Sequence, residues 1–328
     1  MEKTTLLEFL QTNQRDIESR LELAAILGEP AGLYDPVKYV LQSPGKRLRP
    51  QLCLAAADVF GGSHSTAIEI GAAMEIFHIF TLVHDDIMDG SDSRRGRQTV
   101  HVKWDEPTAI LTGDYLLGSA SALLLALPDQ TLRLGLTRFG DTVRALCEGQ
   151  IRDMTFESRQ DVDLDDYLSM IDQKTSALLC TSLVLGALTG QATADDLVLL
   201  DQIGHHLGRA FQIQDDLLDL TASSGQWGKP IGGDLLTAKK TFLLLSAIQV
   251  ERDTESKFFH DMIRDRGLAE NKISAARLLL DEMGVLESAQ NAVLYHSDQA
   301  ALLCNRLPDS MGKDAIVSLI DKMAVRSY

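Results

Sequence analysis

Proline placement divides this chain into long segments that read as helices. All eight prolines fall beside turn-rich stretches or at the start of a periodic segment, where a helix tolerates them. Apolar residues recur with helical spacing in the segments between them, at residues 65–88, 107–127, 130–158, 164–189 and 194–220, and in several more after Pro230. Strand signals are poor, because aromatic residues make up only 5% of the chain and β-branched residues do not alternate with polar ones. The sequence therefore predicts an all-α fold.

The length of 328 residues leaves one or two domains open. No repeat of fixed period and no low-complexity linker interrupts the chain, which favours a single domain over residues 1–328. Thr193 and Asp196 form a capping-box pattern at the start of one helix, and Gly61-Gly62 ends another. Both signals indicate long helices joined by short turns.

Composition excludes several classes of function. A net charge of −16 argues against general nucleic-acid binding, which depends mainly on Lys and Arg neutralising phosphates. No uninterrupted apolar run approaches the roughly 18 to 20 residues that cross a bilayer, so no transmembrane segment and a cytoplasmic location are expected. The four cysteines are scattered, which indicates buried thiols and neither a disulfide framework nor a zinc site. Any anionic ligand must therefore be bound locally, by the few clustered basic residues or a bound cation.

The first acidic cluster, Asp85-Asp86-Ile-Met-Asp89, lies at the end of an apolar helical segment. Asp85 and Asp89 are four residues apart and face the same way, whereas Asp86 is rotated by about 100° and supports them from the side. Like charges at this spacing repel, and the C-terminal end of a helix already carries partial negative charge. Carboxylate oxygens without a histidine or thiolate at the right spacing suit Mg²⁺, which commonly bridges to substrate phosphates.

A second cluster, Asp215-Asp216-Leu-Leu-Asp219, repeats the pattern near the end of another apolar segment. One such motif alone is more often a solvated helix face. Two copies among Leu, Ile, Val and Phe favour a functional role. If the two helices oppose each other across a bundle, their carboxylates can hold several Mg²⁺ ions, and those ions can bind a diphosphate.

Basic residues lie close to both acidic clusters in the sequence. The segment from Lys46 to Arg49 carries three cations at a predicted helix start, and Arg94-Arg95 follows the first cluster within the loop at residues 90–106. Lys229 lies within the stretch at residues 222–237 that follows the second cluster, and Lys239 lies just after it. Other candidates are Lys174 and Thr175, in mid-helix, and His78, two helical turns before Asp85. Taken alone, each of these lysines is more readily explained as a solvated residue, and His78 is equally well explained as a core residue.

Together these motifs resemble the trans-isoprenyl diphosphate synthase family, which includes farnesyl and geranylgeranyl diphosphate synthases. The resemblance extends from about Gly45 to Thr241 through GKRLRP, LVHDDIMDGSDSRRG, LTGDYLL, EGQ, QKT, FQIQDDLLD and GKPIGGD, in the family's order and with family-like spacing. Departures from the family's pattern are Ser43-Pro44 before Gly45, Gln98 where proline is common, and Ala238 where glycine is common. The resemblance implies one antiparallel bundle of about ten or more helices around a central cavity, assembled as a homodimer.

The resemblance also implies roles for individual residues. Isopentenyl diphosphate would be held by Lys46, Arg49, His78 and Arg95, and the allylic diphosphate by Arg94, Lys174, Thr175, Gln212, Lys229 and Lys239. The six aspartates Asp85, Asp86, Asp89, Asp215, Asp216 and Asp219 would bind several Mg²⁺ ions. The implied reaction joins isopentenyl diphosphate to dimethylallyl, geranyl or farnesyl diphosphate through an allylic cation, in which Asp85, Asp86, Asp89, Arg94, Lys174, Asp215 and Lys229 act.

Product length would be set along the helix that precedes Asp85. One aromatic residue at Phe80 followed by Thr81 resembles the archaeal type of geranylgeranyl diphosphate synthase, which makes a C20 product. Phe77 is an equally good floor for the product tail, and plain core packing explains all these aromatics as well. A C15 or bifunctional C15/C20 synthase, a class I terpene cyclase and a non-catalytic partner subunit are the alternatives. The sequence alone leaves the allylic primer and the oligomeric state open.

Overall fold

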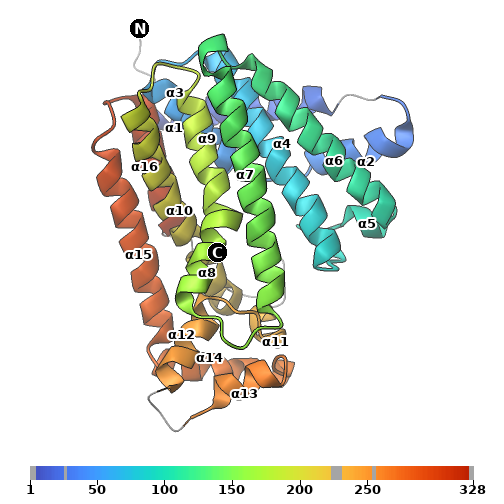
Figure 1. The fold of residues 1–328 in the computed structure, drawn as a ribbon, viewed down its shortest axis with the longest axis vertical. Helices are drawn as coiled ribbons and strands as arrows, with labels where there is room; N and C mark the ends of the chain where they lie inside the picture. The colour runs from blue at the N-terminus through green and yellow to red at the C-terminus, as the bar shows by residue number, and fades with distance from the viewer. Residues whose placement is uncertain (1–4, 26–27, 223–230, 253–255, 325–328) are drawn as a thin grey trace. The chain divides into compact units, whose positions relative to one another are not determined.

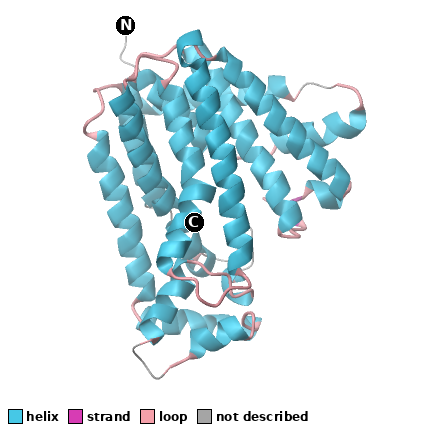
Figure 2. Ribbon diagram, in the orientation of Figure 1, coloured by secondary structure: helices cyan, strands magenta, loops and turns pink. Residues whose placement is uncertain are grey.

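The computed structural model describes residues 5–25, 28–222, 231–252 and 256–324. Helices make up most of these residues, and the described strands form one very short hairpin (Figure 2). The predicted all-α fold is confirmed.

The described residues group into two compact units. The first consists of residues within Met1–Asp141, Leu178–Asp201 and Arg306–Leu319, and the second of residues within Thr142–Ala177, Gln202–Asn305 and Ile320–Tyr328. Four helices contribute residues to both units, namely α7 (Asp129–Phe156), α9 (Ala177–Ala187), α10 (Ala194–Thr221) and α16 (Met311–Ala324). The single domain expected from the sequence stays a prediction.

Helix α4 is the central element of the first unit. It packs against α1, α3 and α6, and Figure 1 shows α4 and α6 running side by side. Residues of α4 such as Ile70, Met74 and Phe77 are completely buried, because apolar side chains occupy most of its circumference. The elements of this part of the chain are α1 (Leu6–Ala24), α2 (Ala31–Leu41), α3 (Leu48–Val59), α4 (His64–Met88), β1 (Ser93–Arg94), β2 (Arg97–Gln98), α5 (Val100–Lys103), α6 (Glu106–Leu123) and the 3₁₀ turn η1 (Leu124–Ala126).

The second unit has a core of its own. Buried residues from α8, α10, α12, α13, α14 and α15 contribute to one apolar cluster that includes Tyr167, Ile213, Leu244, Phe259 and Leu280. Its remaining elements are α8 (Leu164–Ile171), the π-helical turn η2 (Asp172–Ser176), α11 (Gly233–Leu236), α12 (Phe242–Glu251), α13 (Phe258–Arg264), the 3₁₀ turn η3 (Glu270–Lys272), α14 (Ile273–Glu282) and α15 (Val285–Cys304).

The helical segments predicted from periodicity are present, with ends that differ by a few residues. The capping box at Thr193 is confirmed, since the Thr193 and Asp196 side chains each accept a hydrogen bond from the other residue's backbone N–H. Three expectations need correction. The stretch at residues 90–106 is not simply a loop, because it contains the β-hairpin and α5; the helix over 164–189 passes through a π-helical turn; and Cys147 is exposed, unlike the other three cysteines.

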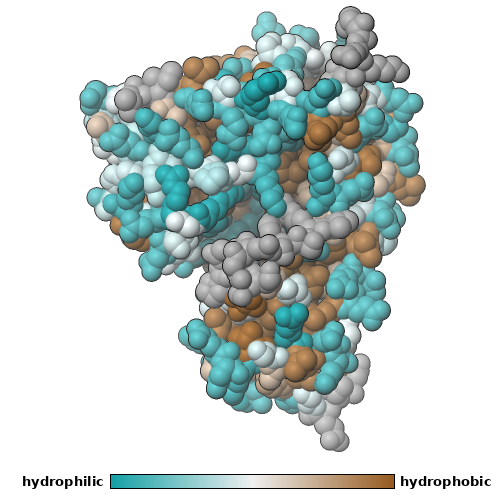
Figure 3. All heavy atoms as spheres, turned by 180° about the vertical axis from the view of Figure 1, so that it is seen from behind, coloured by the Kyte–Doolittle hydropathy of each residue, from teal (hydrophilic) through white to brown (hydrophobic). Residues whose placement is uncertain are grey.

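Two described helices are long and apolar enough to cross a membrane by length and composition, His64–Met88 and Glu106–Ala126. Within its most apolar stretch, 72% of the first is buried inside the protein, compared with 33% of the second. Both helices contain polar residues between the apolar ones, so neither forms an uninterrupted apolar run in the sequence. On the face shown in Figure 3, hydrophilic and hydrophobic residues are interspersed.

Candidate active site

The first aspartate cluster lies at the C-terminal end of α4. Helix α4 ends at Met88, and the backbone N–H of Asp89 donates to the Asp85 carbonyl at 2.8 Å, so the two side chains remain one helical turn apart. Asp85 is half-buried and Asp89 is exposed, whereas Asp86 is only 6% exposed. The expected division into a facing pair and a supporting residue therefore holds within this cluster.

Asp86 is bound by a basic residue from the hairpin. Arg94 Nε donates to its carboxylate at 2.7 Å. Burial raises the pKa of Asp86 above its ordinary value, although the Arg94 guanidinium opposes that rise. Arg94, which the resemblance assigns to the allylic diphosphate, thus lies beside the first aspartate cluster and contributes a positive charge there.

Several guanidinium groups surround His78 on α4. Burial and then the charges of Arg49, Arg95, Arg94 and Arg47 lower the pKa of His78 well below its ordinary value. The imidazole is therefore neutral at physiological pH and can donate one hydrogen bond. Arg49, His78 and Arg95, three of the residues assigned from the sequence to isopentenyl diphosphate, are thus brought together. Their positive charges around His78 create a local environment that suits an anion.

The glycine of the GKRLRP motif allows two arginine side chains to approach the backbone closely. A Cβ atom at Gly45 would lie 3.0 Å from Nη1 of Arg95 and 3.1 Å from Nη1 of Arg47, which is too close for an ordinary contact. The same Arg95 atom donates to the carbonyl oxygen of Pro44. The motif and the hairpin are therefore in direct contact.

Arg47 does not serve as a third cation of the phosphate site, which corrects the simplest interpretation of this basic run. Only 4% of the residue is exposed, and its guanidinium forms ion pairs at 2.8 Å with Glu18 on α1 and Glu75 on α4. Its backbone adopts a left-handed conformation at φ 48°, immediately before α3. Lys46 is exposed and Arg49 half-buried, so these two remain the candidate phosphate ligands of the motif.

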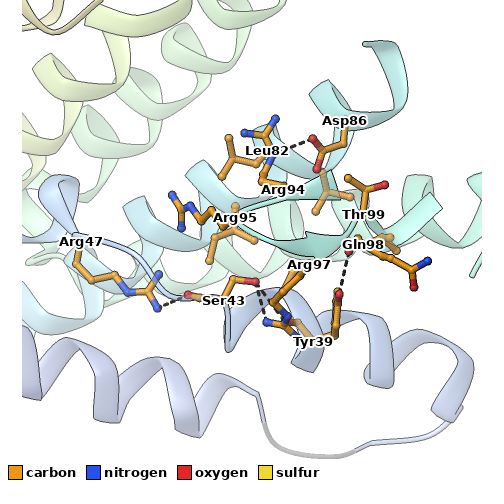
Figure 4. A pocket seen from close by; sticks show the side chains of 14 residues that line it. Tyr39, Ser43, Arg47, Leu82, Asp86, Arg94, Arg95, Arg97, Gln98 and Thr99 are labelled. Carbon is orange, nitrogen blue, oxygen red and sulfur yellow. Dashed lines mark hydrogen bonds and ion pairs between the residues drawn. The ribbon is translucent and has the colours of Figure 1, made fainter. Parts of the chain in front are cut away.

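A pocket lies between α2, α4 and the hairpin (Figure 4). Its wall combines apolar side chains of α4 with arginines from the hairpin. The lining residues are Tyr39, Val40, Ser43, Arg47, Ile79, Leu82, Val83, Asp86, Arg94, Arg95, Arg97, Gln98, Thr99 and Val100.

The second aspartate cluster lies near the end of α10. Asp216 is 5% exposed and accepts hydrogen bonds from the Tyr167 hydroxyl, from Gln212 Nε2 at 3.1 Å and from the Phe242 N–H at 3.1 Å. Burial raises the pKa of Asp216 to about 6 even though these donors favour its charged form. Asp215 is half-buried. In both clusters, therefore, the middle aspartate is buried and held by the protein, while the first is more accessible.

Asp219 organises the segment that follows the second cluster. Its carboxylate accepts from the Asp234 N–H at 3.1 Å, and its carbonyl accepts from the Gly232 N–H at 2.7 Å. These bonds hold the start of α11 against the end of α10. Lys229, a predicted ligand of the allylic diphosphate, lies outside the described residues.

The remaining basic candidates of the second unit gather at one carboxylate. Lys174 Nζ lies 2.7 Å and Lys239 Nζ 3.8 Å from Asp153 on α7. Burial opposes ionisation here, yet these two ammonium groups hold the pKa of Asp153 below its ordinary value. Asp153 thus places two lysines from distant parts of the sequence side by side.

Thr175 is the neighbour of Lys174 in the π-helical turn, and its hydroxyl donates to Gln212 Oε1 at 3.0 Å. Turns of this kind inside α-helices are frequent at functional sites. The sequence gives no sign of the turn itself, because the apolar periodicity of residues 164–189 continues across it.

The predicted chain-length residues lie on α4 before the first cluster. Phe77 is completely buried and stacks on Phe80 with ring centroids 5.7 Å apart, and Phe80 also contacts the His84 ring. Thr81 is 7% exposed and donates to the His78 carbonyl at 2.8 Å. All three side chains are therefore packed in the first unit.

The aspartate carboxylates offer the oxygen ligands that a divalent cation such as Mg²⁺ prefers. Among the described residues, no three His, Cys, Asp or Glu side chains are grouped closely enough to hold a metal ion. Mg²⁺, however, often takes only one or two carboxylates and completes its shell with water and substrate phosphates. A buried carboxylate such as Asp86 is costly when ionised, and a nearby cation would relieve that cost.

Sequence reasoning missed three residues that organise the site: Glu75, Asp153 and Tyr167. Each is a polar or charged side chain inside an apolar helical pattern, which is a weak signal because many such residues reach solvent. Only contacts between helices show that Glu75 pairs with Arg47, Asp153 with two lysines, and Tyr167 with Asp216.

Comparison with known proteins agrees with these motifs. A sequence model of the family described as Polyprenyl synthetase matches residues 30–280. A geranylgeranyl diphosphate synthase of Sulfolobus acidocaldarius is 39% identical over 255 residues, which are 76% of this chain and 77% of that protein.

Solved structures extend the likeness to the whole chain. A crystal structure of a geranylgeranyl pyrophosphate synthase matches with a TM-score of 0.91 and 33% identity, covering 99% of this chain and 100% of that one. A polyprenyl synthase from Caulobacter crescentus, complexed with calcium and isoprenyl diphosphate, matches with a TM-score of 0.88 and 26% identity, and the match covers 100% of both chains.

The helical fold and the paired aspartate motifs with their neighbouring cations define a prenyltransferase. The chain belongs to the polyprenyl synthetase family.

Proposed function

We propose that this enzyme condenses isopentenyl diphosphate with allylic diphosphates and releases the C20 product, geranylgeranyl diphosphate. The observation that carries the proposal is the group of guanidiniums around a neutral His78, on the same helix as the first aspartate cluster. In a chain with a net charge of −16, a group of arginines beside three aspartates is explained by an anion that binds there together with a metal.

The positive charges around His78 in the first unit suit isopentenyl diphosphate. Arg49 and Arg95 offer guanidinium groups for its phosphate oxygens, and the neutral His78 offers one N–H. Lys46 is exposed and contributes a further positive charge from the GKRLRP motif. The roles assigned to these residues agree with their proximity in the fold.

The second unit supplies ligands of the allylic diphosphate. Lys174 and Lys239 both lie beside Asp153, which brings two ammonium groups together where phosphate oxygens could bind. Thr175, the neighbour of Lys174, donates a hydrogen bond to Gln212, and Gln212 in turn donates one to Asp216. Arg94 of the first unit and Lys229 complete the proposed set.

Mg²⁺ is the proposed cofactor, bound by the two aspartate clusters together with the substrate diphosphate. When bound, it would neutralise the negative charge of the leaving diphosphate. Asp85, Asp89 and Asp215 are the accessible ligands, while Asp86, Asp216 and Asp219 are held by hydrogen bonds from the protein and fix the geometry.

The reaction breaks the C–O bond of the allylic diphosphate and forms a C–C bond to the double bond of isopentenyl diphosphate. Loss of a proton then restores an alkene, and the departing diphosphate is the proposed base. The protein's residues bind the two diphosphates and hold the reacting carbons together, so positioning and charge stabilisation supply most of the rate enhancement. No covalent nucleophile is required.

Product length is proposed to depend on α4. Phe80 and Phe77 stack on each other five and eight residues before Asp85, where a growing tail that leaves the metal site would meet them. Thr81 is the next residue after Phe80. A helix rises about 1.5 Å per residue, so these positions lie within a few isoprene lengths of the aspartates.

We also propose that the enzyme is a cytoplasmic homodimer. Helix α6 and the turn after it expose large apolar side chains, including Leu111 at 60% and Leu125 at 65% exposure. A second copy of the chain could cover such residues. The apolar surface of α4, by contrast, is mostly buried within the protein itself and is not available to a membrane.

Product analysis tests the proposed function. The purified chain is incubated with Mg²⁺, isopentenyl diphosphate and in turn dimethylallyl, geranyl or farnesyl diphosphate, and the dephosphorylated products are separated by chromatography. A C20 product that disappears when EDTA is added is expected. A C15 end product would favour the farnesyl alternative, and no turnover by the chain alone would favour a partner subunit.

A further inference from the structure

Tyr39 on α2 contacts the β-hairpin through both its ring and its hydroxyl group. The hydroxyl donates to the carbonyl oxygen of Gln98 at 2.8 Å. The guanidinium carbon of Arg97 lies 3.8 Å and Lys103 Nζ lies 3.9 Å from the ring centroid. Trp104 packs against the same ring edge-on, with centroids 5.2 Å apart. One half-buried tyrosine therefore binds the second strand of the hairpin and the short helix that follows it.

The hairpin has little stability of its own. Each strand has two residues, with Ser93 opposite Gln98 and Arg94 opposite Arg97. Its two turn residues, Arg95 and Gly96, have φ angles of 53° and 74°, as in the type I′ turns that suit a hairpin. Arg95 thus adopts a left-handed conformation that is unfavourable for a residue with a side chain. Isolated hairpins are marginal even when longer, so contacts with the rest of the protein must hold this one.

Helix α2 supplies those contacts at one side of the hairpin. Besides stacking on Tyr39, Arg97 donates from Nη1 to the Ser43 hydroxyl at 3.2 Å (Figure 4). The loss of one cation–π contact or one neutral hydrogen bond at a partly exposed site changes an equilibrium by roughly fivefold. The Tyr39 contacts are therefore large compared with what two two-residue strands can supply.

We propose that Tyr39 is a positioning residue that holds the hairpin so that Arg94 and Arg95 face the substrate diphosphates. Arg94 is paired across the hairpin with Arg97, so a shift of the strand that Tyr39 binds passes directly to Arg94 and to the turn residue Arg95. This inference rests on the proposed function, because it assigns to Tyr39 the placement of two arginines that the reaction uses.

Two substitutions separate the ring from the hydroxyl group. Tyr39→Phe keeps the stacking surface and loses only the bond to Gln98, whereas Tyr39→Leu loses both. The KM for isopentenyl diphosphate is expected to rise by up to about fivefold in the phenylalanine variant, which loses one hydrogen bond. It should rise by roughly tenfold or more in the leucine variant, which also loses the ring contacts with Arg97, Lys103 and Trp104. The kcat at saturating substrate should change less, because the arginines themselves remain.

A second measurement does not depend on activity. Trypsin cleaves after arginine, and the hairpin carries Arg94, Arg95 and Arg97. Limited proteolysis followed by mass spectrometry should show faster cleavage at these three sites in Tyr39→Leu than in wild type. Tyr34→Leu is the matched control, since Tyr34 lies on the same helix, is also half-buried and stacks on Tyr115 instead of the hairpin.

The outcomes are distinct. Faster hairpin cleavage and a raised KM in Tyr39→Leu, with Tyr34→Leu like wild type, support the inference. An unchanged KM, unchanged cleavage, or equal effects in the Tyr34 control would overturn it. A wild-type chain without prenyltransferase turnover would instead refute the proposed function, and the cleavage rates would still decide whether Tyr39 holds the hairpin.

Discussion

Nη1 of Arg47 lies 2.8 Å from Oε1 of Glu75, and the two side chains are only 2% and 4% exposed. A second carboxylate, that of Glu18, lies 2.8 Å from Nε of the same guanidinium. This buried network joins α1, the start of α3 and α4. It therefore fixes the chain on both sides of Arg47, including Lys46 and Arg49.

Replacing Glu75 by glutamine tests the weight of this contact. The substitution leaves a buried guanidinium with less negative charge beside it, so the free energy of unfolding should fall by about 3 kcal/mol. Urea denaturation measures the loss. Glu69→Gln is the control, because Glu69 pairs with Arg20 at 2.7 Å at a more exposed site and should cost less than about 1 kcal/mol. Equal losses in both variants would contradict the structural role of the buried pair.

Asp85→Asn tests the first aspartate cluster. Asparagine keeps the size of the side chain but removes the charge, so turnover should fall about 100-fold or more if the carboxylate binds a catalytic metal. Steady-state rates at several Mg²⁺ concentrations measure the effect. Asp92→Asn makes the same change at an exposed residue just beyond the cluster and should leave the rate near wild type. A fully active Asp85 variant would remove this residue from the site.

The paired imidazoles of the second unit predict a pH-dependent stability. The Nδ1 atoms of His206 and His296 are 2.9 Å apart, and burial, followed by the charges of His206, Arg209 and His205, lowers the pKa of His296 to about 4 from 6.5. Asp172 opposes this shift. The unfolded chain then binds more protons than the folded one between these values. Stability is therefore fully present above pH 6.5 and is lost as the pH falls toward 4.

Denaturation at about pH 7.5 and about pH 5 measures this dependence, which can reach about 1.4 kcal/mol per pH unit for one proton. His296→Leu should reduce the difference between the two conditions. His64→Leu, at an exposed histidine, should leave it unchanged. A loss of stability on acidification that is identical in wild type and in the His296 variant would show that other groups cause it.

Phe80→Ala tests the proposed control of product length. Removing a ring that is 7% exposed and stacked on Phe77 opens space before Asp85, so products longer than those of wild type are expected. Chromatography of the dephosphorylated products shows the distribution. Phe60→Ala, at the end of α3, loses a ring elsewhere and should keep the wild-type length. Unchanged products in the Phe80 variant would defeat the assignment.

Ala238 predicts a substitution that stabilises the protein. It stands where the family commonly has glycine, and its φ angle of 52° lies in the left-handed region that disfavours a Cβ atom. Ala238→Gly should raise the free energy of unfolding by about 0.5 to 1 kcal/mol, after the added chain entropy of glycine is subtracted. Ala292→Gly, inside α15, should instead lower it by about 1 kcal/mol. A destabilised Ala238 variant would show that strain is absent there.

Local sequence patterns were enough to predict the helical class and the approximate extent of the long helices, and to identify the two aspartate motifs. These are local properties, because periodicity, helix caps and i, i+4 spacing depend on residues within a few turns of one another. The same local signals identified Arg49, His78 and Arg95 as candidates, and the structure brings these three together.

The contacts of each charged residue, by contrast, could be seen only in the folded protein, where side chains of different helices meet. Arg47 belongs to the same basic run as Lys46 and Arg49, yet it is buried against Glu18 and Glu75. Asp86 and Asp216 hold the same place in the two motifs, yet the first binds Arg94 and the second binds Tyr167. The physical reason is that burial and ion pairing depend on side chains from other helices, which share no local pattern with the motif they complete.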